Sequence, residues 1–130
     1  MKNLAVLLAF LVTNGSQVSA FDTADLQKFN DTNYCRKCDL SNADLVNGYL
    51  KGADLNGANL AGADLTDANL EGADLEGAIL EGANLIGANL ADANLSAALL
   101  EGADLKGART NGSIFCNTIM PDSSVIYSGC

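Results

Sequence analysis

Four cysteines are the residues of this sequence whose type and spacing most directly suggest chemistry. Cys35 and Cys38 form a Cys-x-x-Cys motif, and Cys116 and Cys130 lie near the other end of the chain. A pair at this spacing is typical of thiol–disulfide exchange or of half a zinc site. Zinc needs two further ligands, and the sequence has no histidine. A thioredoxin-like site needs a βαβ context that the neighbouring residues do not offer. Two buried core residues or a local disulfide are the alternatives to an exchange site.

Acidic side chains are the other abundant reactive type, but their pattern does not favour a catalytic or metal site. The chain has 16 acidic and 7 basic residues and a net charge of −9. Such a charge repels nucleic acid phosphates, so we expect no nucleic-acid partner. A calcium site needs about six to eight converging oxygens, whereas the acidic residues here show no such clustering. Without a nucleophile–base pair, a metal constellation or a phosphate-binding loop, the sequence predicts no enzyme, no metal and no cofactor.

A five-residue repeat organises the chain between these features. Every fifth residue from position 40 to position 105 is leucine, and the residue two places before each leucine is small. On an α-helix five residues turn about 140°, which would spread the leucines around the helix, and on a flat strand an odd step would alternate the faces. Each unit is therefore predicted to be a short extended piece followed by a bend, with its leucine inward. The predicted core ladder is Leu40, Leu45, Leu50, Leu55, Leu60, Leu65, Leu70, Leu75, Leu80, Leu85, Leu90, Leu95, Leu100 and Leu105.

The repeat resembles the pentapeptide-repeat family, whose motif is Ala-Asp/Asn-Leu-x-x. Units that match it include Ala53-Asp54-Leu55-Asn56-Gly57 and Ala88-Asn89-Leu90-Ala91-Asp92. The resemblance implies an all-β fold, a right-handed quadrilateral β-helix in which four of the five-residue units complete each coil. It covers at least residues 38–112, which gives about four to five coils stacked at roughly 4.8 Å.

The segments on either side of the repeat are expected to cover the ends of this solenoid. Residues 21–29 read as a short capping helix with Asp22 as its N-cap and with Leu26 and Phe29 on one face, so residues 21–37 form the predicted N-terminal cap. Residues 113–130 are predicted to form a degenerate last coil and a C-terminal cap. Their expected inward positions are Ser113, Phe115, Thr118, Met120, Ser123 and Val125. Pro121-Asp122 reads as a turn, and residues 125–127 are a candidate final strand.

In such a solenoid the cysteines are expected to pair within each end of the chain. Cys38 and Cys116 would lie nearly four coils apart, roughly 15 to 20 Å at strand spacing, whereas a disulfide needs Cα atoms within about 7 Å. We therefore predict the disulfides Cys35–Cys38 and Cys116–Cys130. Secreted pentapeptide-repeat proteins of cyanobacterial type are similar at both ends, with Cys-x-x-Cys-Asp-Leu and Phe-Cys-Asn-Thr-x-Met-Pro-Asp, matched here by residues 35–40 and 115–122. This resemblance points to a periplasm or a thylakoid lumen.

The N-terminal segment, residues 1–20, is predicted to be a secretory signal peptide. Lys2 precedes an apolar run over residues 4–12, and Val18-Ser19-Ala20 is a small-x-small cleavage site. The apolar run is far shorter than the roughly 20 residues that span a bilayer, so we expect no membrane attachment after cleavage. Removing residues 1–20 takes away one charged residue, Lys2, and leaves a net charge of −10.

One irregularity on the outside of the repeat marks a candidate contact surface. The residue before each leucine is mostly Asp or Asn, and Ile79, Leu99 and Ile119 are exceptions that lie four repeat units apart. With four units per coil these three stack into one row, which we call the apolar stripe. An exposed apolar row on a soluble protein suggests a contact with a partner or a second subunit. The alternative is that the tail, residues 123–130, folds back and covers it.

These observations favour a non-enzymatic, exported structural or protein-interaction module whose partner is an unknown protein or a second copy. One alternative comes from the resemblance: some family members are acidic rods that mimic DNA and bind topoisomerases. The predicted signal peptide opposes this alternative, as does a rod of about 20 Å, which would match only about six base pairs. The second alternative is thiol–disulfide exchange through Cys35 and Cys38.

Overall fold

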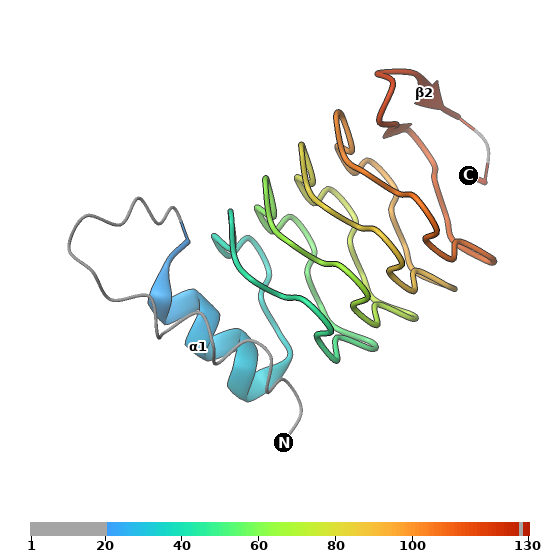
Figure 1. The fold of residues 1–130 in the computed structure, drawn as a ribbon. Helices are drawn as coiled ribbons and strands as arrows, with labels where there is room; N and C mark the ends of the chain where they lie inside the picture. Colours follow the sequence, from blue (N-terminus) through green and yellow to red (C-terminus); the bar gives the residue numbers. More distant parts are fainter. Residues whose placement is uncertain (1–20, 128) are drawn as a thin grey trace.

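The protein is a solenoid with a helix across one end and a short hairpin at the other (Figure 1). A computed structural model describes residues 21–127 and 129–130, so the predicted signal peptide lies outside the described residues. Fourteen parallel bridges each join one residue to the residue 20 positions further on, from Tyr34–Asp54 to Leu99–Ile119. Because a bridge position recurs every five residues, each coil has four sides. This period is the one that the family resemblance implies.

Alternation of inward and outward side chains explains why the repeat folds this way. The ladder leucines from position 40 to position 100 are completely buried, and the small residues two places before them lie beside them in the core. Leu105, at the C-terminal end of the ladder, is only partly buried. Successive coils are joined by backbone hydrogen bonds, for example from Leu55 N–H to the carbonyl of Asp74 at 2.8 Å. The core is therefore one continuous column of leucine and alanine along the axis.

Each coil bends at the last residue of the five-residue unit. Gly57 has a φ of 67° there, in the left-handed region that glycine enters without steric cost. At Ala97 the same corner has a φ of 57° without a glycine, and Asn or Asp occupies several others. The corners are closed by hydrogen bonds such as that from Ala58 N–H to the carbonyl of Leu55 at 3.0 Å.

The N-terminal end is covered by α1 (Thr23–Thr32), which lies across the first coil (Figure 1). Asp22 is its N-cap, as predicted, and accepts hydrogen bonds from the N–H groups of residues 24 and 25. The helix continues past the predicted end at Phe29 to Thr32, and Asn33 closes it in a left-handed conformation. No helix in the described part of the chain is long and apolar enough to cross a membrane.

The solenoid begins earlier than the predicted boundary at residue 38. Tyr34 already bridges Asp54, and Cys35 N–H donates to the carbonyl of Asp54 at 2.7 Å. The segment that was expected to be only a cap therefore supplies the first unit of the first coil. The repeat register gives Cys35 the leucine position and Cys38 the small inward position, so the spacing continues into this unit while the residue types change.

The C-terminal end closes with a chain reversal that the repeat does not predict. β1 (Thr118–Ile119) pairs antiparallel with β2 (Val125–Ile126). The reversal lies between them, where Met120 N–H donates to the carbonyl of Ser124 at 2.8 Å. The expected inward positions of Ser123 and Val125 are therefore wrong, since both residues are exposed. The five-residue register ends at Met120, because the chain turns back there.

Candidate interaction surface

Most outward Asp and Asn side chains are used to build the corners of the coil. Their Oδ1 atoms accept a hydrogen bond from the backbone N–H two residues later, for example from Thr66 to Asp64 at 3.1 Å. This local arrangement is the reason why Asp and Asn are favoured before a turn. The same bond forms at Asp39, Asp44, Asp54, Asn59, Asp64, Asn69, Asp74, Asn84, Asn89, Asn94 and Asp104.

The apolar stripe occupies three of these outward positions with side chains that cannot accept a hydrogen bond. The structure bridges Ile79 to Leu99 and Leu99 to Ile119, so the three lie in one row on one side of the rod. All three are half-buried. We call each bridge position along one side a rung. At the rung of Ile119 the residue two places later is Pro121, which has no N–H to donate to an outward side chain. The stripe therefore replaces a structural hydrogen-bonding row with an apolar one at the C-terminal half of this side.

The tail lengthens this row and does not fold over it. Val125 is the antiparallel partner of Ile119, and directly paired residues place their side chains on the same face of a sheet. Val125 is 40% exposed. The turn predicted at Pro121-Asp122 and the strand predicted at residues 125–127 agree with this hairpin, whereas the inward position predicted for Val125 is wrong.

The charged groups that pair lie away from this stripe. Arg36 Nε donates to Asp54 Oδ2 at 2.7 Å, and Lys51 Nζ lies 2.9 Å from Glu71 Oε1. The hydrogen bond from Lys51 lowers the pKa of Glu71 and raises the pKa of Lys51. The hydrogen bond to Asp54 likewise raises the pKa of Arg36. Exposed pairs of this kind contribute little stability, so they mainly fix where the basic side chains point.

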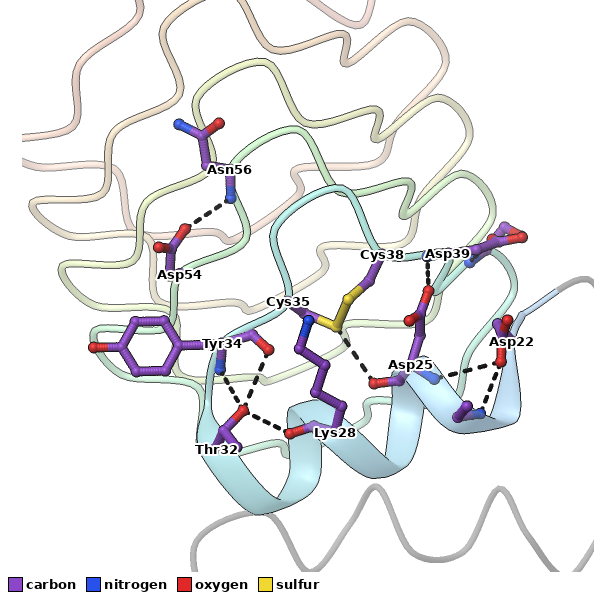
Figure 2. Close-up of a disulfide and its surroundings, with 12 residues drawn as sticks. Asp22, Asp25, Lys28, Thr32, Tyr34, Cys35, Cys38, Asp39, Asp54 and Asn56 are labelled. Atoms are coloured by element: carbon purple, nitrogen blue, oxygen red, sulfur yellow. Dashed lines mark hydrogen bonds between the residues drawn. A yellow bond between two sulfur atoms is a disulfide. The ribbon is translucent and has the colours of Figure 1, made fainter.

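The Cys-x-x-Cys motif lies beneath α1 (Figure 2). A disulfide joins Cys35 and Cys38, whose Cα atoms are 5.1 Å apart, and both residues are buried. Asp25 lies over them: its carbonyl lies 3.4 Å from Cys35 Sγ, and its side chain accepts the N–H of Asp39 at 2.8 Å. Thiol exchange needs access to a sulfur atom, and burial under a helix argues against a substrate protein reaching this one.

The second pair of cysteines lies at the opposite end, where Cys116 is half-buried and Cys130 is exposed. A disulfide joins Cys116 to Cys130 across 14 residues, with a Cα–Cα distance of 4.9 Å. It ties the end of the tail to the last coil. Within the described residues no group of three potential metal-ligating side chains comes together. The Asp residues at positions 44, 64 and 104 stack on one side, and each uses its carboxylate on its own corner.

Solved structures to which this chain is similar include pentapeptide-repeat proteins. Among solved structures, the chain is similar to HetL, a pentapeptide-repeat protein involved in heterocyst differentiation regulation from the cyanobacterium Nostoc sp. strain PCC 7120. The identity is 32%, the match covers 72% of this chain and 62% of HetL, and the TM-score is 0.46. It is also similar to a pentapeptide-repeat protein of the Arabidopsis thaliana thylakoid lumen, with 34% identity, 68% and 62% coverage and a TM-score of 0.35. The chain spans less than two thirds of the length of either protein.

The family model places the repeat where the structure has its coils. No curated protein matches the sequence significantly. The model for pentapeptide repeats, however, matches residues 34–72 and 68–107. Its first matched residue, Tyr34, is also the first residue of the bridge ladder. Since the match covers more than half of the chain and follows the observed coils, this protein belongs to the pentapeptide-repeat family.

Proposed function

We propose that this protein is a non-enzymatic, exported protein-interaction module of a periplasm or thylakoid lumen, and that the apolar stripe is its contact surface. The proposal includes a right-handed rod of four to five coils, as the family implies. The observation that carries it is the row formed by Ile79, Leu99 and Ile119, half-exposed where most other units have Asp or Asn. The chain forgoes a corner hydrogen bond at Ile79 and Leu99, although such bonds contribute about 0.5–1.5 kcal/mol each.

Two further features support a role in an oxidising, exported compartment. Residues 1–20 have the pattern of a cleavable signal peptide, and all four cysteines are paired in disulfides. Disulfides persist mainly outside the cytosol. The alternative of a topoisomerase-binding DNA mimic has no specific observation in its favour, because most outward Asp and Asn side chains accept hydrogen bonds from backbone N–H groups at the coil corners.

Site-specific photo-cross-linking in cells that make the protein tests this function. A photoreactive residue at position 99 is expected to give a cross-linked product of defined mass in the exported fraction. The matched control carries the same residue at position 114, an exposed outward isoleucine on the neighbouring side of the rod. Equal cross-linking from both positions, none from position 99, or a protein retained in the cytosol would reject the proposal.

A further inference from the structure

The part of this side of the rod that carries the apolar stripe, its C-terminal part, is acidic and has no basic residue. Its last three rungs with their adjoining corners are residues 76–82, 96–102 and 116–122, which contain no Lys or Arg. They contain four carboxylates, namely Glu76, Glu81, Glu101 and Asp122.

Two of these carboxylates border the stripe directly. Glu81 and Glu101 are exposed and follow Ile79 and Leu99 by two residues. Their corners are stacked, because Gly82 N–H donates to the carbonyl of Glu101 at 2.9 Å. The stripe therefore has a negative edge beside two of its three members, Ile79 and Leu99. Arg36 and Lys51 do not pair with Glu81 or Glu101, because they form salt bridges with Asp54 and Glu71 elsewhere on the rod.

This charge distribution favours a basic partner on the apolar stripe over a second copy of the protein. Two copies that met through the stripe would bring the carboxylates of one close to those of the other, and such like-charge contacts are unfavourable at an interface. A partner with apolar residues between Lys or Arg side chains would be complementary to both the stripe and its edge.

The geometry of the row favours a helix as the partner element. The backbone groups of the central rungs already pair with neighbouring coils, so a partner contacts this side through side chains. An α-helix satisfies its own backbone and presents an apolar row at about 5.4 Å per turn, close to the rung spacing of about 4.8 Å. With Val125 the row has four members and spans roughly 14 Å, the length of about ten helical residues.

We propose that the apolar stripe, lengthened by Val125, binds one basic amphipathic helix of a partner protein. Leucine-type side chains of that helix pack on Ile79, Leu99 and Ile119, and its flanking Lys or Arg side chains pair with Glu81 and Glu101. This inference rests on the proposed function, since it names the partner class of the same surface.

Two synthetic helical peptides test the inference by fluorescence anisotropy with the full chain in its disulfide-bonded form. The first has a leucine row flanked by lysines, and its twin has glutamate in place of every lysine. We expect saturable binding of the lysine peptide, with the glutamate twin about tenfold weaker or more. Raising the salt concentration should weaken the first interaction, because exposed charges are screened.

Matched variants locate the contact. Leu99→Asn introduces the residue that the repeat uses at Asn89 and Asn94, so the variant should fold, and circular dichroism checks this. It should weaken binding of the lysine peptide about tenfold or more, since one large apolar contact is lost. Ile114→Asn should leave binding within about twofold. Combining Glu81→Gln with Glu101→Gln should weaken binding and reduce its dependence on salt.

Four outcomes overturn the inference: no binding of the lysine peptide, equal binding of both peptides, equal binding by wild type and Leu99→Asn, or a concentration-dependent dimer that Leu99→Asn abolishes. The last outcome would identify a second copy as the occupant. If position 99 cross-links to a protein in cells but the lysine peptide does not bind, the proposed function stands and the proposal of a basic helix as the partner is rejected. If there is neither cross-linking nor peptide binding, both proposals are rejected.

Discussion

The two ends of the solenoid are closed in different ways. At the N-terminal end α1 buries Leu26 and Phe29 completely against the first coil, and its capping residues bond to the coil: Asp22 N–H donates to the carbonyl of Asp39 at 3.0 Å. At the C-terminal end β2 pairs with one side of the last coil, and the core residues Leu105, Phe115 and Met120 stay partly exposed. One end is sealed by packing, whereas the other is held by a short hairpin and a disulfide.

This difference indicates where the chain can present a surface. A helix that covers the whole end of a column removes its apolar groups from water. A hairpin that pairs along one side adds another outward residue, Val125, to the row that begins at Ile79. The core side chains are thus less completely buried toward the C-terminal end, and the apolar stripe lies in the same half of the rod.

The largest expected effect comes from the N-terminal packing. Phe29→Ala should lower the free energy of unfolding by about 3–5 kcal/mol, because it opens a cavity beneath α1 where the native side chain is completely buried. Phe115→Ala, at the partly exposed opposite end, is the matched variant and should cost clearly less. Guanidinium unfolding followed by circular dichroism measures both. Equal losses would remove the contrast between a packed end and an open one.

For the disulfides the larger loss in the free energy of unfolding is expected at the C-terminal end. Replacing Cys116 and Cys130 by alanine removes a constraint across 14 residues, whereas the pair at Cys35 and Cys38 spans 3. In the chain-entropy model the losses are about 3 and about 2 kcal/mol respectively. Unfolding of each double variant, compared with wild type without reductant, provides the measurement. A larger loss at the N-terminal pair would show that this disulfide, more than the packing of α1, holds that end.

A single hydrogen-bonding side chain should matter more at the sealed end. Asp25→Ala leaves the N–H of Asp39 without its acceptor in a partly buried place, at a cost of about 1–3 kcal/mol. Asp25→Asn is the control, since its amide oxygen can still accept that hydrogen bond. The same unfolding assay applies, and Asp122→Ala in the exposed C-terminal turn should change the midpoint less. If Asp25→Ala behaves like wild type, α1 is held by its apolar face alone.

The smallest effect is a pH dependence of the C-terminal turn. Hydrogen bonds from the Ser124 hydroxyl and N–H lower the pKa of Asp122 below its ordinary value of 3.8. A lowered pKa in the folded state contributes stability that is present above the ordinary value and is lost as the pH falls through the folded pKa. NMR titration of the Asp122 carboxyl follows this directly. Ser124→Ala should move its pKa back toward the ordinary value, and an unchanged titration in that variant would contradict the assignment.

Much of the fold follows from local spacing. The leucine column, the corners and the start of α1 at Asp22 each depend on residues that lie within a few positions of one another. In the first unit, which begins at Tyr34, Cys35 and Cys38 replace the usual side chains and are buried at the inward positions that the repeat register gives them. The row of Ile79, Leu99 and Ile119 could be predicted because the family resemblance implies four units per coil, so that residues 20 positions apart are neighbours in space.

The five-residue period, and with it the inward place of each ladder leucine, can be worked out from the residues alone, because every unit repeats the same local turn chemistry. The way in which the chain ends is seen only in the folded protein. The reversal at residues 120–124 and the pairing of Val125 with Ile119 join segments that share no repeat, so spacing carries no information about them. They form because the last coil presents an unpaired edge, and the nearest chain able to pair with it is the tail.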